Sequence, residues 1–135
     1  MWKPVQLALI FTLSAIPPAA AEQPFSASFE DATLRIDYYH TGNAEEESIA
    51  VDRLLRHGIW AGPRSGLAGP SPLGTYYFQA RDAATGELVF AKGYDSYFAE
   101  YRTTARAAAG TLRTYHESVL LPFPRRPLVA SISAR

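Results

Sequence analysis

Alternation of apolar and polar residues is the main pattern along this chain, and it predicts strands. The clearest hairpin has its strands at residues 75–80 and 88–91, both rich in aromatic and other β-prone residues. The polar run at 82–86 connects them and ends in a glycine, which adopts the left-handed conformation of a turn at low steric cost. Aromatic residues then alternate with turn formers at 93–98. We expect that segment to bend across a sheet and close its core.

The best alternation outside the hairpin lies at residues 32–40. Leu34, Ile36 and Tyr38 fall on one face of this strand, and polar or half-polar residues fall on the other. Three further strands are predicted at residues 25–29, 111–121 and 128–133, with a turn at 30–31 after the first of them and an end to the second at Pro122.

Residues 45–57 fit two structures. Val51, Leu54 and Leu55 have the spacing of a helix face, whereas Ile49 and Val51 alternate as they would in a strand. The residues alone leave helix and strand open here.

The segments between these elements are typical of turns and loops. Residues 58–72 are rich in Gly and Pro, and Trp60 is their one large side chain, expected to cover a sheet edge or to stack on a ligand. The Ala-rich stretch at 103–109 predicts one or two helical turns. Many short strands separated by turn signals indicate an all-β fold, a single jelly-roll-like β-sandwich of about six to eight short antiparallel strands.

The first residues have the pattern of a secretory signal peptide. Lys3 precedes an apolar run at 5–16, and Ala19-Ala20-Ala21 forms a small-residue cleavage site. We predict a signal peptide at 1–21 and one mature domain at 22–135, exported to the periplasm or the extracellular space. The alternative, a membrane anchor, is disfavoured because the apolar run is shorter than the roughly 20 residues that span a bilayer.

Composition removes several function classes. The chain has 13 basic and 13 acidic residues, which argues against the positive surface that binds nucleic acid. It has no Cys, which excludes disulfides, thiolate nucleophiles and Cys-built zinc sites. The domain must therefore be held together by its core.

One short motif resembles the start of a zinc site. His116 and Glu117 begin a His-Glu-x-x-His sequence, in which two His one helical turn apart bind the metal. The fifth position is Leu120, and the segment is predicted to be a strand, where positions i and i+4 lie too far apart. No metal site is predicted here.

The remaining catalytic candidates are no stronger. A cluster of His40, His57 and His116 with Asp37 or Glu117 is conceivable, but nothing in their spacing requires it, and hydrogen-bonding roles are expected.

Ser65 and Ser96 lack the Gly-x-Ser-x-Gly context of a nucleophile, and turn-forming roles are expected for both. No catalytic residue, cofactor site or metal ligand is predicted.

Four aromatic residues form the one candidate ligand surface. Trp60, Tyr94, Tyr97 and Tyr101 would stack on a sugar or grip a peptide if they were exposed together on the sandwich. The alternative is that they fill the core or its rim, where a Tyr buries its ring and keeps its hydroxyl hydrated.

Several segments together resemble a bacterial family. They are LRIDYYHTG at 34–42 with the three Glu that follow, IWAG at 59–62, the hairpin region at 74–101 and TYHESVLLPFPRRPL at 114–128. Their order and spacing resemble the N-terminal domain of the secreted zinc metallopeptidases grouped with IgA peptidase, metallopeptidase family sixty-four. The resemblance extends from about Phe25 to the last residue.

The resemblance implies a β-sandwich-like accessory domain, and it favours a strand at 45–55. The zinc-binding His-Glu-x-x-His motif belongs to the family's catalytic domain, so its catalytic residues have no counterparts here. We therefore expect a non-catalytic domain, not an enzyme on its own, that supports or orients a peptidase domain, in cis or in trans, or its substrate. The alternative is a stand-alone cell-envelope module that binds carbohydrate or peptide.

Overall fold

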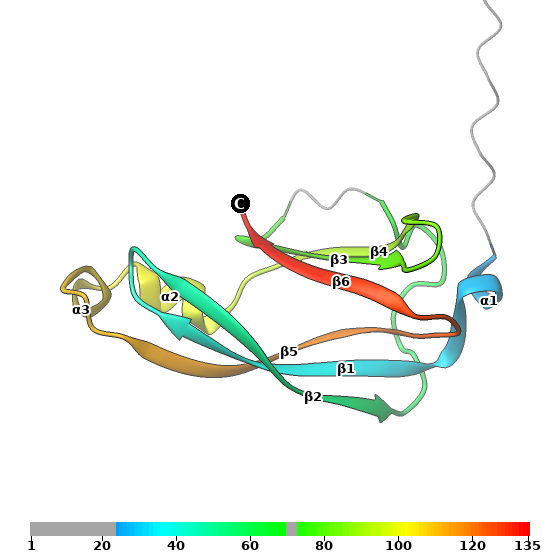
Figure 1. The fold of residues 1–135 in the computed structure, drawn as a ribbon, viewed down its shortest axis with the longest axis horizontal. Coiled ribbons are helices and arrows are strands. Elements are labelled where there is room, and N and C mark those ends of the chain that lie inside the picture. Colours follow the sequence, from blue (N-terminus) through cyan, green and yellow to red (C-terminus); the bar gives the residue numbers. More distant parts are fainter. Residues whose placement is uncertain (1–23, 70–72) are drawn as a thin grey trace, which may run out of the picture.

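The protein folds into two small β-sheets packed face to face (Figure 1). The computed structural model describes residues 24–69 and 73–135, so the predicted signal peptide lies outside the described residues. The elements in chain order are α1 (Phe25–Ser28), β1 (Phe29–Gly42), β2 (Glu47–His57), β3 (Tyr76–Asp82), β4 (Leu88–Tyr94), α2 (Tyr97–Arg102), α3 (Ala105–Ala108), β5 (Arg113–Pro124) and β6 (Leu128–Ala134).

Each sheet has three antiparallel strands. The first has the order β2-β1-β5 and the second has the order β4-β3-β6. The first sheet extends beyond the second at one end, where α2 and α3 lie against it, and α1 lies at the other end (Figure 1). The predicted all-β sandwich is confirmed, although β1 and β5, with 14 and 12 residues, are longer than expected. No helix in the described part of the chain has the length and hydropathy needed to cross a membrane.

The main core lies between the two sheets. Ile36 and Tyr38 project into it from β1, which confirms the predicted inner face of that strand. Trp60 packs against this core edge-on to Phe90, with ring centroids 6.2 Å apart. The buried members of the core are Phe29, Ile36, Tyr38, Leu67, Phe78, Ala80, Phe90, Val119 and Leu121.

The predicted hairpin is formed by β3 and β4. The carboxylate of Asp82 accepts hydrogen bonds from the amides of Ala84 and Thr85 at 2.9 and 3.0 Å, which fixes the turn. Gly86 has a φ of 74°, the left-handed conformation expected from the sequence. The second strand of the hairpin continues to Tyr94, beyond the predicted end.

The prediction for residues 25–31 is wrong. Residues 25–28 form the helical turn α1, and β1 then runs without a turn through Glu30 and Asp31. The irregularity appears instead as a register shift against β5 between Glu30 and Thr33. Thr33 pairs with Pro122 there, so the proline sits at a bulge on an edge strand, where its missing N–H is tolerated, and β5 continues to Pro124.

Helix α2 was not predicted, whereas α3 confirms the expected helical turns at 103–109. The Ser96 hydroxyl caps α2 by accepting a hydrogen bond from the Ala99 amide at 3.1 Å. Phe98 and Tyr101 turn inward from this helix into a second small core. The core is therefore closed after β4, as expected, and the closing element is the helix α2.

Residues 47–57 are the edge strand β2. Tyr38 of β1 pairs with Val51 and Asp37 pairs with Arg53, so Asp52 is an extra residue in a β-bulge. Because the bulge shifts the alternation by one residue, Val51 and Leu54 face the same side although they are three positions apart. The bulge thus explains why the spacing resembled that of a helix.

Candidate functional site

A buried histidine lies at the centre of the most connected polar cluster. His40 has an exposed fraction of 0% and projects from the inner face of β1. Its Nε2 lies 2.9 Å from Oε2 of Glu47, and its Nδ1 lies 3.2 Å from Oε2 of Glu117. The ring of Phe98 covers it, with centroids 3.9 Å apart. Each ring nitrogen of His40 is therefore within hydrogen-bond distance of a carboxylate oxygen.

Other groups complete the hydrogen bonds of the two carboxylates. The Tyr76 hydroxyl donates to Glu47 at 2.6 Å, and Arg102 donates to the other oxygen of Glu47 at 3.1 Å. The Phe98 amide donates to Glu117 at 3.2 Å. The cluster therefore joins both sheets and α2.

Burial and hydrogen bonding have opposite effects on these groups. Burial raises the pKa of Glu47, but hydrogen bonds from Tyr76 and His40 outweigh it, and the net pKa lies below the ordinary value. Burial likewise raises the pKa of Glu117, and hydrogen bonds from His40 and the Phe98 amide bring it below the ordinary value. Burial and the bond to Glu47 raise the pKa of Tyr76 to about 12. Each of these side chains has a hydrogen-bond partner, which is typical of a buried polar cluster that stabilises a fold.

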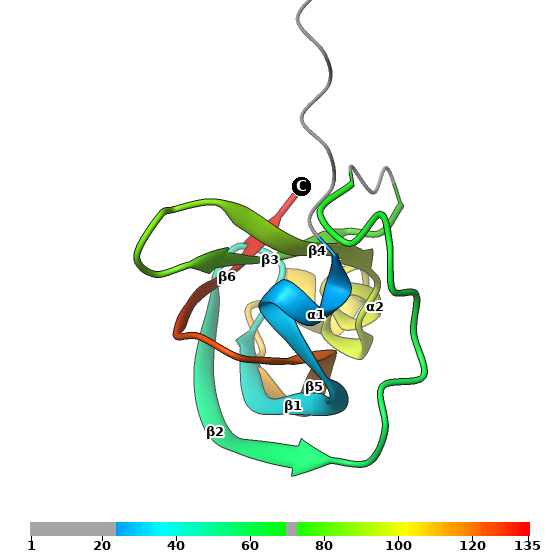
Figure 2. The same ribbon diagram turned by 90° about the vertical axis from the view of Figure 1, so that its right-hand side faces the viewer.

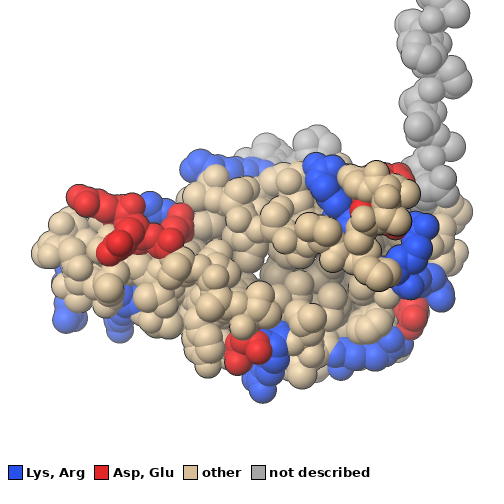
Figure 3. Space-filling model, in the orientation of Figure 1, with Lys and Arg blue, Asp and Glu red and all other residues tan. Residues whose placement is uncertain are grey.

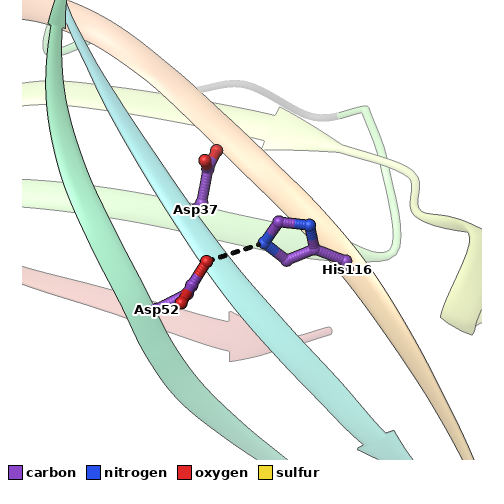
Figure 4. Close-up of side chains that lie close together, drawn as sticks. All are labelled: Asp37, Asp52 and His116. Carbon is purple, nitrogen blue, oxygen red and sulfur yellow. Dashed lines mark hydrogen bonds and ion pairs between the residues drawn. The ribbon is translucent and has the colours of Figure 1, made fainter.

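A second cluster lies on the outer face of the first sheet. Asp37, Asp52 and His116 place their ligand-type atoms within 4.8 Å of one another (Figure 4). However, Asp37 already accepts hydrogen bonds from Arg35 and Arg53, and its pKa is held low mainly by Arg35. A cation would have to displace two guanidinium groups, so this cluster does not fit a metal ion. Its chemistry is that of an ion-pair network.

The three histidines are not brought together. His40 and His116 lie on opposite faces of the first sheet, because His40 pairs with Tyr115 and Tyr39 pairs with His116. His57 is exposed at the end of β2. The predicted strand at His116 is confirmed, and His116 and Glu117 consequently point to opposite faces. Of the two serines, Ser96 caps α2, as a turn-forming role requires, and Ser65 lies in the loop after β2.

Two of the four predicted ligand-surface residues line one cavity of about 370 Å³, here called the tyrosine cleft. Tyr97 is 74% exposed, and Tyr94 is partly buried with its hydroxyl 3.0 Å from that of Tyr38. Tyr101 is instead buried in the core beside α2, and Trp60 packs on the main core. The cleft is lined by Tyr38, Tyr94, Asp95, Ser96, Tyr97, Glu100, His116, Glu117 and Ser118.

A larger apolar groove opens between the edge strands β2 and β6. This β2–β6 groove has a volume of about 470 Å³, and its walls include Ile49, Val51 and Leu54 of β2. Val51 and Leu54 are 65% and 63% exposed, although both belong to the inner face of their sheet. Figure 3 shows the hollow in the middle of the molecule, with walls largely free of charged side chains. Its other lining residues are Leu34, Ile36, Phe78, Ala80, Leu121, Pro124, Arg126, Pro127, Leu128, Ala130, Ser131 and Ile132.

The groove lies away from the loop that follows β2. Residues 58–69 run down the opposite side from one sheet to the other (Figure 2). There the amide of Ala91 on β4 donates to the carbonyl of Leu67 at 2.7 Å, which covers part of that sheet edge. The exposed inner face of β2 was not predicted from the sequence. The interrupted alternation of Ile49, Val51 and Leu54 was the feature that could have indicated it.

Comparison with known proteins gives one family. No curated protein matches the chain. The sequence model described as the N-terminus of peptidase M64 matches residues 24–135, which include every element of the sandwich. This match confirms the resemblance found in the sequence. The chain therefore belongs to the family of peptidase M64 N-terminal domains.

Proposed function

We propose that this domain is a non-catalytic accessory domain of a secreted, IgA-type zinc metallopeptidase. In this proposal it supports or orients a peptidase domain, or that domain's substrate, by binding it at the β2–β6 groove. The family match supports the accessory role because it concerns the N-terminus of a peptidase. The groove supports the docking surface, because its lining also includes Leu128, Ala130 and Ile132 of β6.

The exposed inner face of β2 is the observation that carries this proposal. Apolar side chains on the inner face of a sandwich sheet are normally covered by the opposing sheet. Here Val51 and Leu54 remain more than half exposed. Contiguous exposed apolar surface of this kind usually marks an interaction site, because burying it against a partner removes it from water.

The proposal is tested by mixing the domain with a catalytic domain of the same peptidase family and measuring binding by calorimetry. A Val51→Glu substitution places a charge in the groove, and we expect it to weaken binding by about tenfold or more. Val129→Glu is the matched control, because Val129 is 61% exposed on the neighbouring edge strand β6 and does not line the groove. Equal binding by both variants, or no binding by the unaltered domain, would contradict the proposal.

The tyrosine cleft supports a second candidate function, a module that binds carbohydrate or peptide. Tyr97 offers an exposed ring for stacking, and Asp95 and Glu100 offer carboxylate acceptors beside it. Titration with oligosaccharides and short peptides, followed by NMR, tests this function. Shifts confined to the cleft and lost in Tyr97→Ala support it, and an unchanged spectrum overturns it.

The proposed location, periplasm or extracellular space, rests on the pattern of Lys3, the apolar run and Ala19-Ala20-Ala21. Fusing residues 1–21 to a reporter that is active only after export tests it. A reporter that stays in the cytoplasm would contradict it.

A further inference from the structure

The two walls of the β2–β6 groove are both edge strands with an unpaired side. β2 ends the sheet order β2-β1-β5, and β6 ends the order β4-β3-β6. Within residues 24–69 and 73–135, the backbone of β2 pairs only with β1. Its free edge therefore presents main-chain donors and acceptors next to an apolar groove, which is the arrangement that accepts an added strand.

The side chains of β2 indicate the shape of the occupant. Ile49, Val51 and Leu54 form a row on the groove side, and all residues of β2 except Leu55 are exposed. A strand beside this edge places every second side chain on the groove side, since side chains alternate along a strand. An extended segment of about six residues with alternating apolar side chains matches the length of this row.

The charges at the two ends of the groove indicate at which end a charged residue of the bound segment would lie. One end continues into a cavity of about 530 Å³ whose lining includes Arg56, Arg125 and Arg126. Arg56 and Arg126 are paired with Glu30 and Asp82, at 2.7 and 3.0 Å.

Arg125 is different, because its Nε donates to the backbone carbonyls of Ser26 and Phe29 and its charge is not matched by a carboxylate in the described chain. The opposite end is lined by Glu47, whose charge is engaged by His40 and Arg102. Of the two ends, only the arginine end therefore has a positive charge without a paired carboxylate among the described residues, that of Arg125. This charge favours an acidic residue on the bound segment.

We propose that the β2–β6 groove receives an extended segment of the partner protein, which adds as a strand to the free edge of β2. Alternate apolar side chains of that segment fill the groove, and an acidic side chain at one of its ends pairs with Arg125. The added strand extends the first sheet beyond β2 and covers the groove between β2 and β6. This inference rests on the docking function proposed above and specifies the partner's chemistry.

Synthetic eight-residue peptides test the inference directly. Two of them alternate Val and Thr over six residues and carry an Asp pair at the amino or the carboxyl end, and two matched peptides carry Lys in place of Asp. We expect one Asp peptide to bind about tenfold or more tightly than its Lys counterpart. We also expect it to slow amide hydrogen exchange on β2 and not on β4.

Two substitutions, each with a matched control, test whether the peptide binds in the groove. Val51→Glu should abolish peptide binding, and Val129→Glu should leave it unchanged. Arg125→Gln should remove the preference for the Asp peptide. Arg81→Gln should keep it, because Arg81 is an exposed arginine that also donates to a carbonyl but does not line the groove or the cavity at its end.

Strand addition would be overturned if neither Asp peptide protects β2, or if Asp and Lys peptides bind equally. In a second experiment, a catalytic domain of the same peptidase family is added in place of the peptides. If it binds at Val51 without slowing exchange on the β2 edge, strand addition fails while the docking function stands. If it does not bind at all, the docking function itself fails.

Discussion

His40 is buried, and its two ring nitrogens are hydrogen-bonded to the carboxylates of Glu47 and Glu117. Removing the imidazole and two carboxylates from water is costly, yet each has hydrogen-bond partners from another element. Among the described residues, no buried polar side-chain atom lacks a partner. The cluster therefore joins β1, β2, β3, α2 and β5.

The substitution Glu117→Gln tests whether the cluster around His40 stabilises the fold. The substitution keeps the size of the side chain but removes the charge that faces His40, so we expect a loss of about 2 kcal/mol in the free energy of unfolding. Urea unfolding measures it. Glu45→Gln is the control, because Glu45 is exposed and its side chain takes no part in the cluster. An equal loss in both variants would contradict the role given to Glu117.

The same carboxylates predict an acid-sensitive stability. The pKa values of Glu47 and Glu117 lie below the ordinary value of 4.5 in the folded protein. Their contribution is therefore fully present above about pH 4.5 and is lost as the pH falls through the lower, folded pKa values. We expect unfolding free energies to decline over that window, and to decline less steeply in Glu117→Gln. An identical pH dependence in the two proteins would contradict this explanation.

Among the strands, β2 is the most exposed, because every residue in it except Leu55 is exposed. It pairs with β1 along one edge, and its inner face opens into the β2–β6 groove. The bulge at Asp52 keeps Ile49, Val51 and Leu54 on that face, while Asp52 lies with His116 on the outer face of the sheet. The bulge therefore sets which side chains a partner would meet.

Two single-residue deletions separate the bulge from the strand. Removing Asp52 gives a regular strand with the same inward residues, so we expect the fold and the groove to persist at a cost of about 1 kcal/mol, partly from the lost ion pair with His116. Removing Ala50 gives a strand of equal length in which Asp52 faces the groove. We expect a cost larger by roughly 1–2 kcal/mol, because a carboxylate then borders apolar surface. Thermal unfolding distinguishes them, and the opposite order would contradict the assigned bulge.

Elements with an uninterrupted period were predictable from the sequence. The face of β1 with Ile36 and Tyr38, and the turn at Gly86, follow from alternation and from the conformational freedom of glycine. β2 remained ambiguous because one bulged residue gave its apolar positions helical spacing. Helix α2 was hidden because its cap, Ser96, stands among aromatic residues that are equally compatible with a strand.

The candidate sites were less predictable because they depend on pairing between distant segments. His40 meets Glu117 only through the alignment of β1 with β5, which local patterns do not specify. The same is true of Tyr94 and Tyr97, which were predicted as surface residues without their cleft, and of Tyr101, which turned inward with α2. The groove requires the sandwich to be open at β2 and β6, a property of the whole arrangement.

For the whole molecule, the central feature is a sandwich covered on one side and open on the other. The loop of residues 58–69 covers one side (Figure 2), and the apolar groove lies between the edge strands β2 and β6. The docking of a peptidase domain that we propose for this groove would cover the exposed side chain of Val51, and it is consistent with the match to a peptidase N-terminus.

The most direct test uses the absence of Cys in this chain, which allows a single labelling site to be introduced. Val51→Cys and Val129→Cys are each labelled with a dye whose emission shifts to shorter wavelength when water is excluded. A catalytic domain of the same peptidase family is then added. We predict a saturable shift for the dye at position 51 and none at position 129. A shift only at position 129, or none at either, would contradict docking at the β2–β6 groove.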